Sequence, residues 1–188
     1  MKWRAVLERS RRHLWLAMQK YFCFCLLGVG IFLTACGAGR IIGRTYTNEA
    51  KGFAVQLPPN AWSVETGKEA DLVLRHKDRQ AGIVVNATCG EIPPDRPLAI
   101  TSRHLFFGIQ EKEILRQEQR TGREGEVFEV VLRGELGGRE LLLHGYTLKG
   151  PGCVYDLVLF ASPEAYSEVN GEFEALVRRF HLLSGETQ

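Results

Sequence analysis

The sequence lacks the short motifs that identify most enzymes. It has no G-x-S-x-G, no P-loop and no CxxC, and no two of its histidines stand at a metal-ligand spacing such as HxxxH. Ser102, Arg103 and His104 are adjacent in the chain, so on a helix their side chains would diverge by about 100° per residue. These absences predict a protein that is not an enzyme and that uses no metal or other cofactor.

An excess of basic charge is missing from most of the chain. The formal net charge is +2, but the first 36 residues contain six of the 24 basic residues and only one of the 22 acidic ones. The remaining 18 basic and 21 acidic residues give a net charge of −3. The sequence therefore gives no reason to expect a nucleic-acid partner.

Charge is also absent from residues 21–35, which follow the basic N-terminus. This layout is typical of an export signal, so we expect residues 1–35 to be a signal peptide, with Met18 as an alternative start. Fifteen residues span about 22 Å as a helix, less than the roughly 30 Å hydrocarbon core, which disfavours a transmembrane anchor. Residues 10–15 weakly resemble a twin-arginine motif, but the strongly apolar run favours the general secretory route.

The apolar run ends in Leu33-Thr34-Ala35-Cys36, which resembles the lipobox of bacterial lipoproteins. The resemblance implies cleavage before Cys36 and transfer of diacylglycerol to its thiol, with an ordinary cleaved signal or a membrane helix as the alternatives. Acyl chains on Cys36 would hold the protein at the extracytoplasmic face of the cell envelope. We expect residues 36–43 to be the lipidated cysteine and a flexible tether, and residues 44–188 to form one globular domain.

Alternating and helical patterns predict the elements of that domain. Strands are expected over 44–48, 53–57, 71–76, 82–89, 113–118, 126–135, 139–148 and 153–161, and helices over 98–110 and from 163 onward with Ser162 as N-cap. Cys89 and Cys153 each end a strand beside a glycine-containing loop, so we expect either a disulfide or two buried thiols.

The strands after residue 126 allow a prediction of register. Gly137-Gly138 predicts a two-residue hairpin that pairs Leu136 with Arg139, and a turn over 149–152 would pair Leu148 with Cys153. Both faces of the middle strands are then apolar, so we expect an α+β fold in which helices cover an antiparallel sheet on both sides.

The same register brings polar side chains together. Glu129, Tyr146 and Tyr155 would share a row with His144 one row away, which is either a ligand or partner patch or an ordinary aromatic pair beneath a helix. Asp156 would lie on the opposite face among valines, where a buried carboxylate needs a partner.

The start of the domain resembles PsbP-like domains. The residues that carry the resemblance are Tyr46-Thr47-Asn48, Gly52 to Pro58 and Trp62, and the later order of elements also fits. The resemblance implies an α/β/α sandwich and a role in binding or assembly, but no functional residue. We therefore expect a membrane-anchored binding or assembly module, with an envelope protein complex as a candidate partner. The alternative is a small-molecule carrier or enzyme that uses Glu129, His144, Tyr146 and Tyr155.

Overall fold

The computed structural model describes residues 39–65, 70–90 and 96–183. The expected signal segment and Cys36 lie outside these residues. No helix in the described part of the chain is long and apolar enough to cross a membrane. Part of the segment expected to be a tether, residues 40–42, forms a strand that pairs with the first predicted strand.

A four-stranded antiparallel sheet contains both ends of the described chain. Its order is β1-β2-β3-β11, formed by Arg40–Ile42, Thr45–Asn48, Phe53–Gln56 and Phe180–Leu182. The strands predicted over 44–48 and 53–57 are confirmed as β2 and β3, which pair antiparallel, and Gly52 takes a φ of +67° in the turn between them. β1 and β11 were not predicted because each has only three residues.

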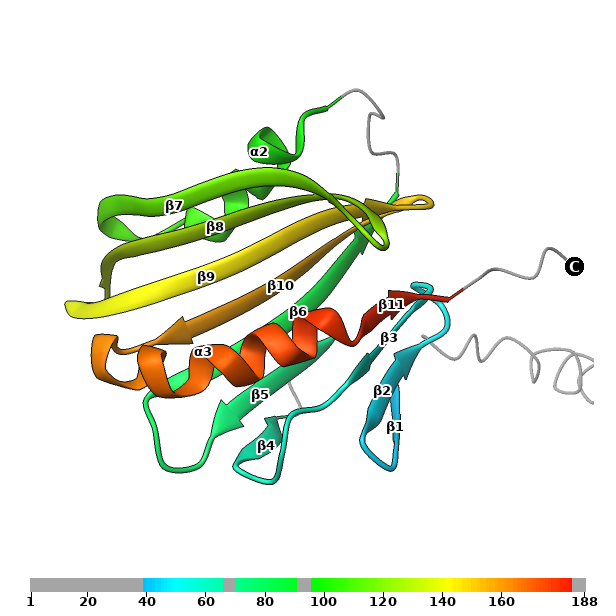
Figure 1. The fold of residues 1–188 in the computed structure, drawn as a ribbon, viewed down its shortest axis with the longest axis horizontal. Coiled ribbons are helices and arrows are strands. Elements are labelled where there is room, and N and C mark those ends of the chain that lie inside the picture. Colours follow the sequence, from blue (N-terminus) through cyan, green and yellow to red (C-terminus); the bar gives the residue numbers. More distant parts are fainter. Residues whose placement is uncertain (1–38, 66–69, 91–95, 184–188) are drawn as a thin grey trace, which may run out of the picture. The chain divides into compact units, whose positions relative to one another are not determined.

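A seven-stranded antiparallel sheet forms the centre of the domain (Figure 1). Its order is β4-β5-β6-β10-β9-β8-β7. In chain order the strands are Trp62–Glu65, Leu72–His76, Ala81–Cys89, Gln110–Gly122, Gly125–Leu136, Arg139–Gly150 and Cys153–Ala161. The strands predicted over 71–76 and 82–89 are confirmed as the paired strands β5 and β6, and the predicted hairpin of β8 and β9 is confirmed, with Leu136 paired to Arg139 as expected.

The predicted register between β9 and β10 is wrong by two residues. Cys153 pairs with Gly150, not with Leu148, because the turn consists of only Pro151 and Gly152. Gly152 has a φ of +69°, and a proline followed by such a glycine suits a tight two-residue turn. The shift by two keeps every side chain on its predicted face but changes its neighbours.

Helix α3 (Pro163–Arg178) covers one face of the large sheet (Figure 1). Its start is as predicted, because the Ser162 hydroxyl accepts a hydrogen bond from the Ala165 N–H and Pro163 is the first helical residue. Ala165, Val169, Phe173 and Leu176 are buried in a core cluster that also contains Leu157 and Leu159 of β10 and Phe53 of the small sheet.

The predicted helix over 98–110 is wrong. Its first residues form a short helix α2 (Leu98–Thr101) and a 3-10 helix η1 (Ser102–Phe106), and strand β7 begins at Gln110. Pro97 stands at the N-cap and offers no side-chain acceptor, and the helical path ends at Phe107, whose backbone is extended, before Gly108 takes a φ of +80°. Leu98 and Ile109 nevertheless belong to a second core cluster with Val158 of β10, and Leu105 packs against this cluster.

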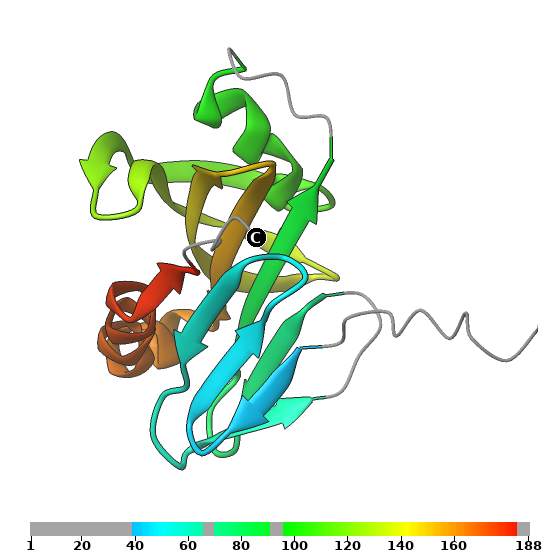
Figure 2. The same ribbon diagram turned by 90° about the vertical axis from the view of Figure 1, so that its right-hand side faces the viewer.

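The domain is mostly β-sheet. The predicted antiparallel sheet is confirmed, but helices provide less of its cover than expected. On the face of Leu157 and Leu159 the small sheet joins α3 in covering the core. On the face of Val158 the cover that the structure describes comes from α2, η1 and Ile109. Figure 2 shows the small sheet standing beside the large one.

Candidate functional site

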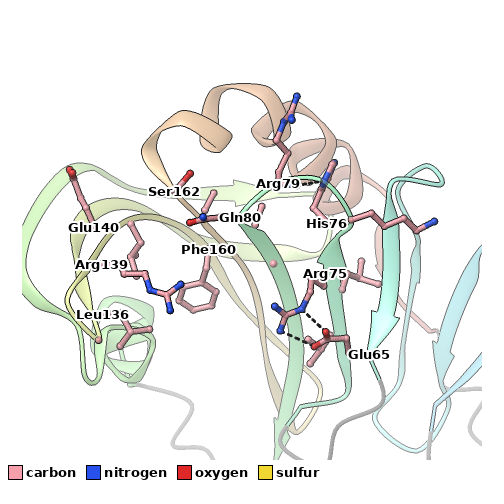
Figure 3. Close-up of a pocket in the computed structure, with 18 residues that line it drawn as sticks. Glu65, Arg75, His76, Arg79, Gln80, Leu136, Arg139, Glu140, Phe160 and Ser162 are labelled. Atoms are coloured by element: carbon pink, nitrogen blue, oxygen red, sulfur yellow. Dashed lines mark hydrogen bonds and ion pairs between the residues drawn. The ribbon is translucent and has the colours of Figure 1, made fainter.

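A cavity of about 630 Å³ lies at one end of the large sheet (Figure 3). The turn between β5 and β6, the hairpin of β8 and β9 and the start of α3 surround it. Its floor includes Gly82 and Phe160, which pair across β6 and β10, and Leu141 of β9. Phe160 and Leu141 belong to the face that α2 and η1 cover elsewhere, so this end of that face is left open.

Gly82 helps to open the cavity. It stands between Arg75 of β5 and Phe160 of β10 in one cross-strand row. A side chain at this position would fill the gap, because a Cβ on Gly82 would make only an ordinary 3.5 Å contact with the Leu74 carbonyl oxygen. The absence of a side chain at Gly82 therefore leaves space in the cavity, although the surrounding backbone would allow a side chain there.

Among the described residues, the charged side chains around the cavity have a hydrogen-bond or ion-pair partner, with one exception. Arg75 binds Glu65, Arg79 binds Glu168, and Glu140 lies 3.3 Å from the Arg133 Nε. The Lys77 ammonium donates to the Asn60 carbonyl oxygen at 2.7 Å. Arg139 has no hydrogen bond or ion pair among the described residues, and Figure 3 labels it with Phe160 among the residues that line the cavity.

The predicted polar patch lies beneath α3 as a closed network. Glu129 and His144 are in neighbouring rows of β8 and β9, and the His144 Nε2 lies 3.1 Å from the Glu129 Oε1. The His144 Nδ1 lies 2.7 Å from the Asn170 amide oxygen of α3. His144 is 0% exposed and Glu129 4% exposed, so neither side chain can reach a ligand in this arrangement.

Two arginines of β7 neutralise the buried carboxylate. Arg116 donates to the Glu129 Oε1, and the Arg120 Nη2 lies 3.2 Å from the Glu129 Oε2. Arg120 also lies over the Tyr146 ring, 5.8 Å from its centroid. Because a buried carboxylate without partners is strongly unfavourable, this network ties β7, β8, β9 and α3 together.

Tyr146 is the member of the patch that borders a cavity. It forms part of a second, smaller cavity of about 220 Å³ together with apolar residues that include Leu157 and Val177. Burial, reinforced by the negative charges of Glu129 and Glu174, raises the pKa of Tyr146 above its ordinary value. Tyr146 therefore stays a neutral phenol at physiological pH.

Tyr155 does not join the other three residues. It pairs with Leu148 because of the shifted register, and Tyr146 pairs with Leu157. The Tyr155 hydroxyl donates to the Lys51 carbonyl oxygen at 2.8 Å, and its ring packs edge-on against Phe53 at 5.7 Å. Tyr155 thus belongs to the contact between the two sheets.

Asp156 has the partners that its burial requires. The Thr147 hydroxyl donates to one carboxylate oxygen at 2.7 Å, and the His104 Nε2 of η1 lies 2.8 Å from the other. The His104 Nδ1 faces the Thr101 carbonyl oxygen at 2.6 Å. The hydrogen bond to Asp156 raises the pKa of His104, which burial opposes.

Cys89 and Cys153 are joined in the structure as a disulfide between the ends of β6 and β10, with an S–S distance of 1.98 Å. The two residues are directly opposite each other in the strand register. The link joins the ends of β6 and β10 that lie opposite to the ends lining the large cavity.

Reasoning from the sequence missed the cavity residues and the arginine partners. The cavity depends on Gly82, Arg139 and Phe160, which the chain brings together from three strands. A signal was present in the sequence, since an isolated glycine inside a strand often marks a close approach or a gap. Arg116 and Arg120 were missed because register shifts between Gln110 and Arg116 change the phase of β7.

Comparisons with known proteins identify the fold. No protein-family model and no curated protein matches the chain. The solution structure of cyanobacterial PsbP (CyanoP) from Synechocystis matches with a TM-score of 0.54 and 16% identity, covering 80% of this chain and 95% of that one. LpqN, involved in cell envelope biogenesis of Mycobacterium tuberculosis, also has a TM-score of 0.54, with 14% identity over 70% of this chain and 85% of its own.

A structure from Bacteroides thetaiotaomicron gives the same TM-score of 0.54 at 9% identity, covering 77% of this chain and half of that one. At these identities the likeness shows a shared fold. The PsbP-like fold expected from residues 46–62 is therefore supported.

Proposed function

We propose that this protein is a lipid-anchored, non-catalytic binding module at the extracytoplasmic face of a bacterial membrane, and that the large cavity is its binding site. The scaffold has a PsbP-like fold, in which α3 and the small sheet cover one face of the large sheet. Cys36 carries the lipid, and the segment that follows it leads into β1.

One observation carries the proposal. The described chain begins next to β1 in the small sheet, and in Figure 1 the start of α3 and the β8–β9 hairpin, which line the large cavity, lie at the other end of the domain. A domain held by a tether before β1 can thus turn its cavity away from the membrane.

The fold and its relatives are compatible with this role. LpqN is involved in cell envelope biogenesis, and a place at the envelope is the part of that description that we carry to this chain. The polar side chains that are brought together beneath α3 are locked in mutual hydrogen bonds, an arrangement that supports a scaffold better than a reaction centre.

The anchor is tested by mass spectrometry and membrane fractionation of the wild type and of Cys36→Ala. We expect the wild type to begin at a diacylglycerol-modified Cys36 and to sediment with membranes, and Cys36→Ala to lose the modification. Cys25→Ala, within the expected signal, is the matched control and should behave as the wild type does. Cleavage and membrane retention of Cys36→Ala at the same site would refute lipidation.

The binding role is tested by purifying the protein from membranes. We expect a second component, a protein or a small molecule, to copurify in constant ratio with the wild type. Gly82→Leu, which fills the cavity, should lose it, and Gly171→Ala on the exposed side of α3 should keep it. Equal copurification with the two variants would show that the component does not bind in the large cavity.

One observation favours a second candidate function, a small-molecule carrier at the predicted patch. Tyr146 borders the 220 Å³ cavity, whose other walls are mainly apolar. The role of Glu129 and His144 would then be to hold Tyr146 in place. Val177→Trp, which would fill this cavity, should abolish binding under this function and leave it unchanged if the large cavity is the site.

A further inference from the structure

We propose that the large cavity binds a small ligand in which a carboxylate or phosphate group is joined to an apolar body. The inference rests on the proposed binding role of the cavity and names the chemistry of its ligand. It follows from the charge left unpaired at the rim, the apolar floor and the size of the space.

The unpaired charge belongs to Arg139. The other cations that line the cavity are held by Glu65, Glu168 and a backbone carbonyl, as described above. Arg139 is the first residue of β9. The Gly137-Gly138 turn places it opposite Leu136. An arginine presents a planar fork of donors that matches a carboxylate or a phosphate, so its free guanidinium selects an anion.

The start of α3 does not compete for this role. Ser162 lines the cavity, but its hydroxyl already accepts the Ala165 N–H of the first helical turn. The backbone N–H of Ser162 donates to the Gln80 carbonyl oxygen at 2.9 Å. The Ser162 hydroxyl and N–H therefore already have partners within the protein. Arg139 remains as the group that binds the anion.

The floor beside Arg139 is apolar. Phe160 is only partly buried, although its neighbours Leu159 and Ala161 are in the core. Gly82 leaves room next to the Phe160 ring, and Leu141 continues the apolar surface toward Arg139. A ligand with its anionic group at Arg139 would cover this floor with its remaining atoms, which gains the free energy of burying apolar surface.

The size of the space suits a small molecule. Ligand cavities in proteins commonly have volumes of about 300–1,000 Å³, and this one has about 630 Å³. A medium-length alkyl or an aromatic group with one acidic end is of that class. A partner protein that inserts an acidic side chain is the competing occupant, and the experiment separates the two.

The test is a calorimetric titration of the full chain in lipid nanodiscs, with empty nanodiscs as the blank. The probes are hexanoate, hexyl phosphate and uncharged 1-hexanol. We expect one or both anions to bind at least about 10-fold more tightly than hexanol, since a hydrogen bond to a charged group gives roughly that factor. The preferred anion then distinguishes a carboxylate from a phosphate as the natural group.

Variants assign the effect to residues. Arg139→Gln should weaken the anions at least about 10-fold and leave hexanol nearly unchanged. Arg103→Gln, at an exposed arginine of η1 that does not line the cavity, is the matched control and should change nothing. Gly82→Leu should block all three probes, and if it fails to fold, the exposed Arg139 variant still decides.

The proposal is overturned if no probe binds, if hexanol binds as tightly as the anions, or if Arg139→Gln binds like the wild type. It is also overturned if the component that copurifies through the cavity is a protein. These outcomes are independent of the anchor, because the behaviour of Cys36→Ala in fractionation decides that part of the proposed function alone.

Discussion

His104 and Asp156 join η1 to the large sheet through a charge pair that depends on pH. Both ring nitrogens of His104 face acceptors, the Thr101 carbonyl oxygen and the Asp156 carboxylate. Only the imidazolium can donate to both, which agrees with the raised pKa of His104. The pair therefore stabilises the fold fully below the ordinary histidine pKa of 6.5, and this contribution is lost as pH rises through the folded-state pKa.

Replacing Asp156 tests this pair. In Asp156→Asn the main cause of the raised pKa is gone and burial remains, so the His104 titration midpoint should fall. Thr147→Val, which removes only a neutral donor to the same carboxylate, should keep the midpoint above 6.5. Nuclear magnetic resonance titration of the His104 ring gives the midpoints, and an unchanged value in Asp156→Asn would contradict the assignment.

Glu129 is a second residue whose contribution to stability depends on its neighbours. Glu129→Gln would leave Arg116 and Arg120 without their buried counter-charge, and breaking a buried ion pair typically costs about 3–5 kcal/mol. Because both arginines are partly exposed, we expect Glu129→Gln to lower the free energy of unfolding by about 3 kcal/mol. Glu118→Gln, on the exposed strand directly opposite, should change the free energy of unfolding by about 0.5 kcal/mol or less. Urea denaturation measures both, and similar effects in the two variants would show that the network is not buried in solution.

At the scale of elements, we expect replacement by alanine at two glycines to have opposite effects on stability. A Cβ on Gly171 of α3 would meet no atom within 4 Å, so Gly171→Ala should stabilise the protein by about 0.5–1 kcal/mol. A Cβ on Gly134 of β8 would lie 2.4 Å from the Ile109 side chain and 2.8 Å from the Gln110 carbonyl oxygen, so Gly134→Ala should destabilise it by about 1–3 kcal/mol. Thermal or urea unfolding measures both, and a stabilising Gly134→Ala would mean that segment 109–110 does not lie over β8.

The same elements show how far the sequence predicts this fold. Strand alternation and the Gly137-Gly138 turn were enough for the β8–β9 register, which placed Glu129, His144 and Tyr146 together. The β9–β10 register was missed because the number of residues in the turn, two and not four, depends on the backbone angles of Pro151 and Gly152. The helix predicted over 98–110 was wrong because its apolar spacing is served equally well by two short helical turns that dock on the sheet.

The candidate site was less predictable for a physical reason. A buried network can be inferred from side chains that share a row of the sheet. A cavity depends on where the segments that cover the sheet end. Gly82 and Phe160 lie on a face whose other half is covered by α2 and η1, and only the lengths of those helices leave this end open. Arg139 then stands out only when the partners of all other charges are known.

At the scale of the whole molecule, the Cys89–Cys153 link joins strands that are 64 residues apart in the chain. A cross-link of this span typically stabilises a domain by about 2–4 kcal/mol, mainly by restricting the unfolded chain. The double variant Cys89→Ala/Cys153→Ala should lose about that much in urea denaturation, and a reductant should destabilise the wild type but not the variant. Equal stability with and without reductant in the wild type would mean that the two thiols are not joined in solution.

The central claim is that the anchored domain binds its ligand or partner at the large cavity. The most direct measurement places a photocrosslinking amino acid at Gln80, which lines the cavity, or at Gln119, an equally exposed residue of β7 that does not. After irradiation of intact cells, mass spectrometry of the membrane fraction should find a defined adduct on the Gln80 form and none on the Gln119 form. An adduct of the same kind and amount at both positions, or none at Gln80, would contradict the account.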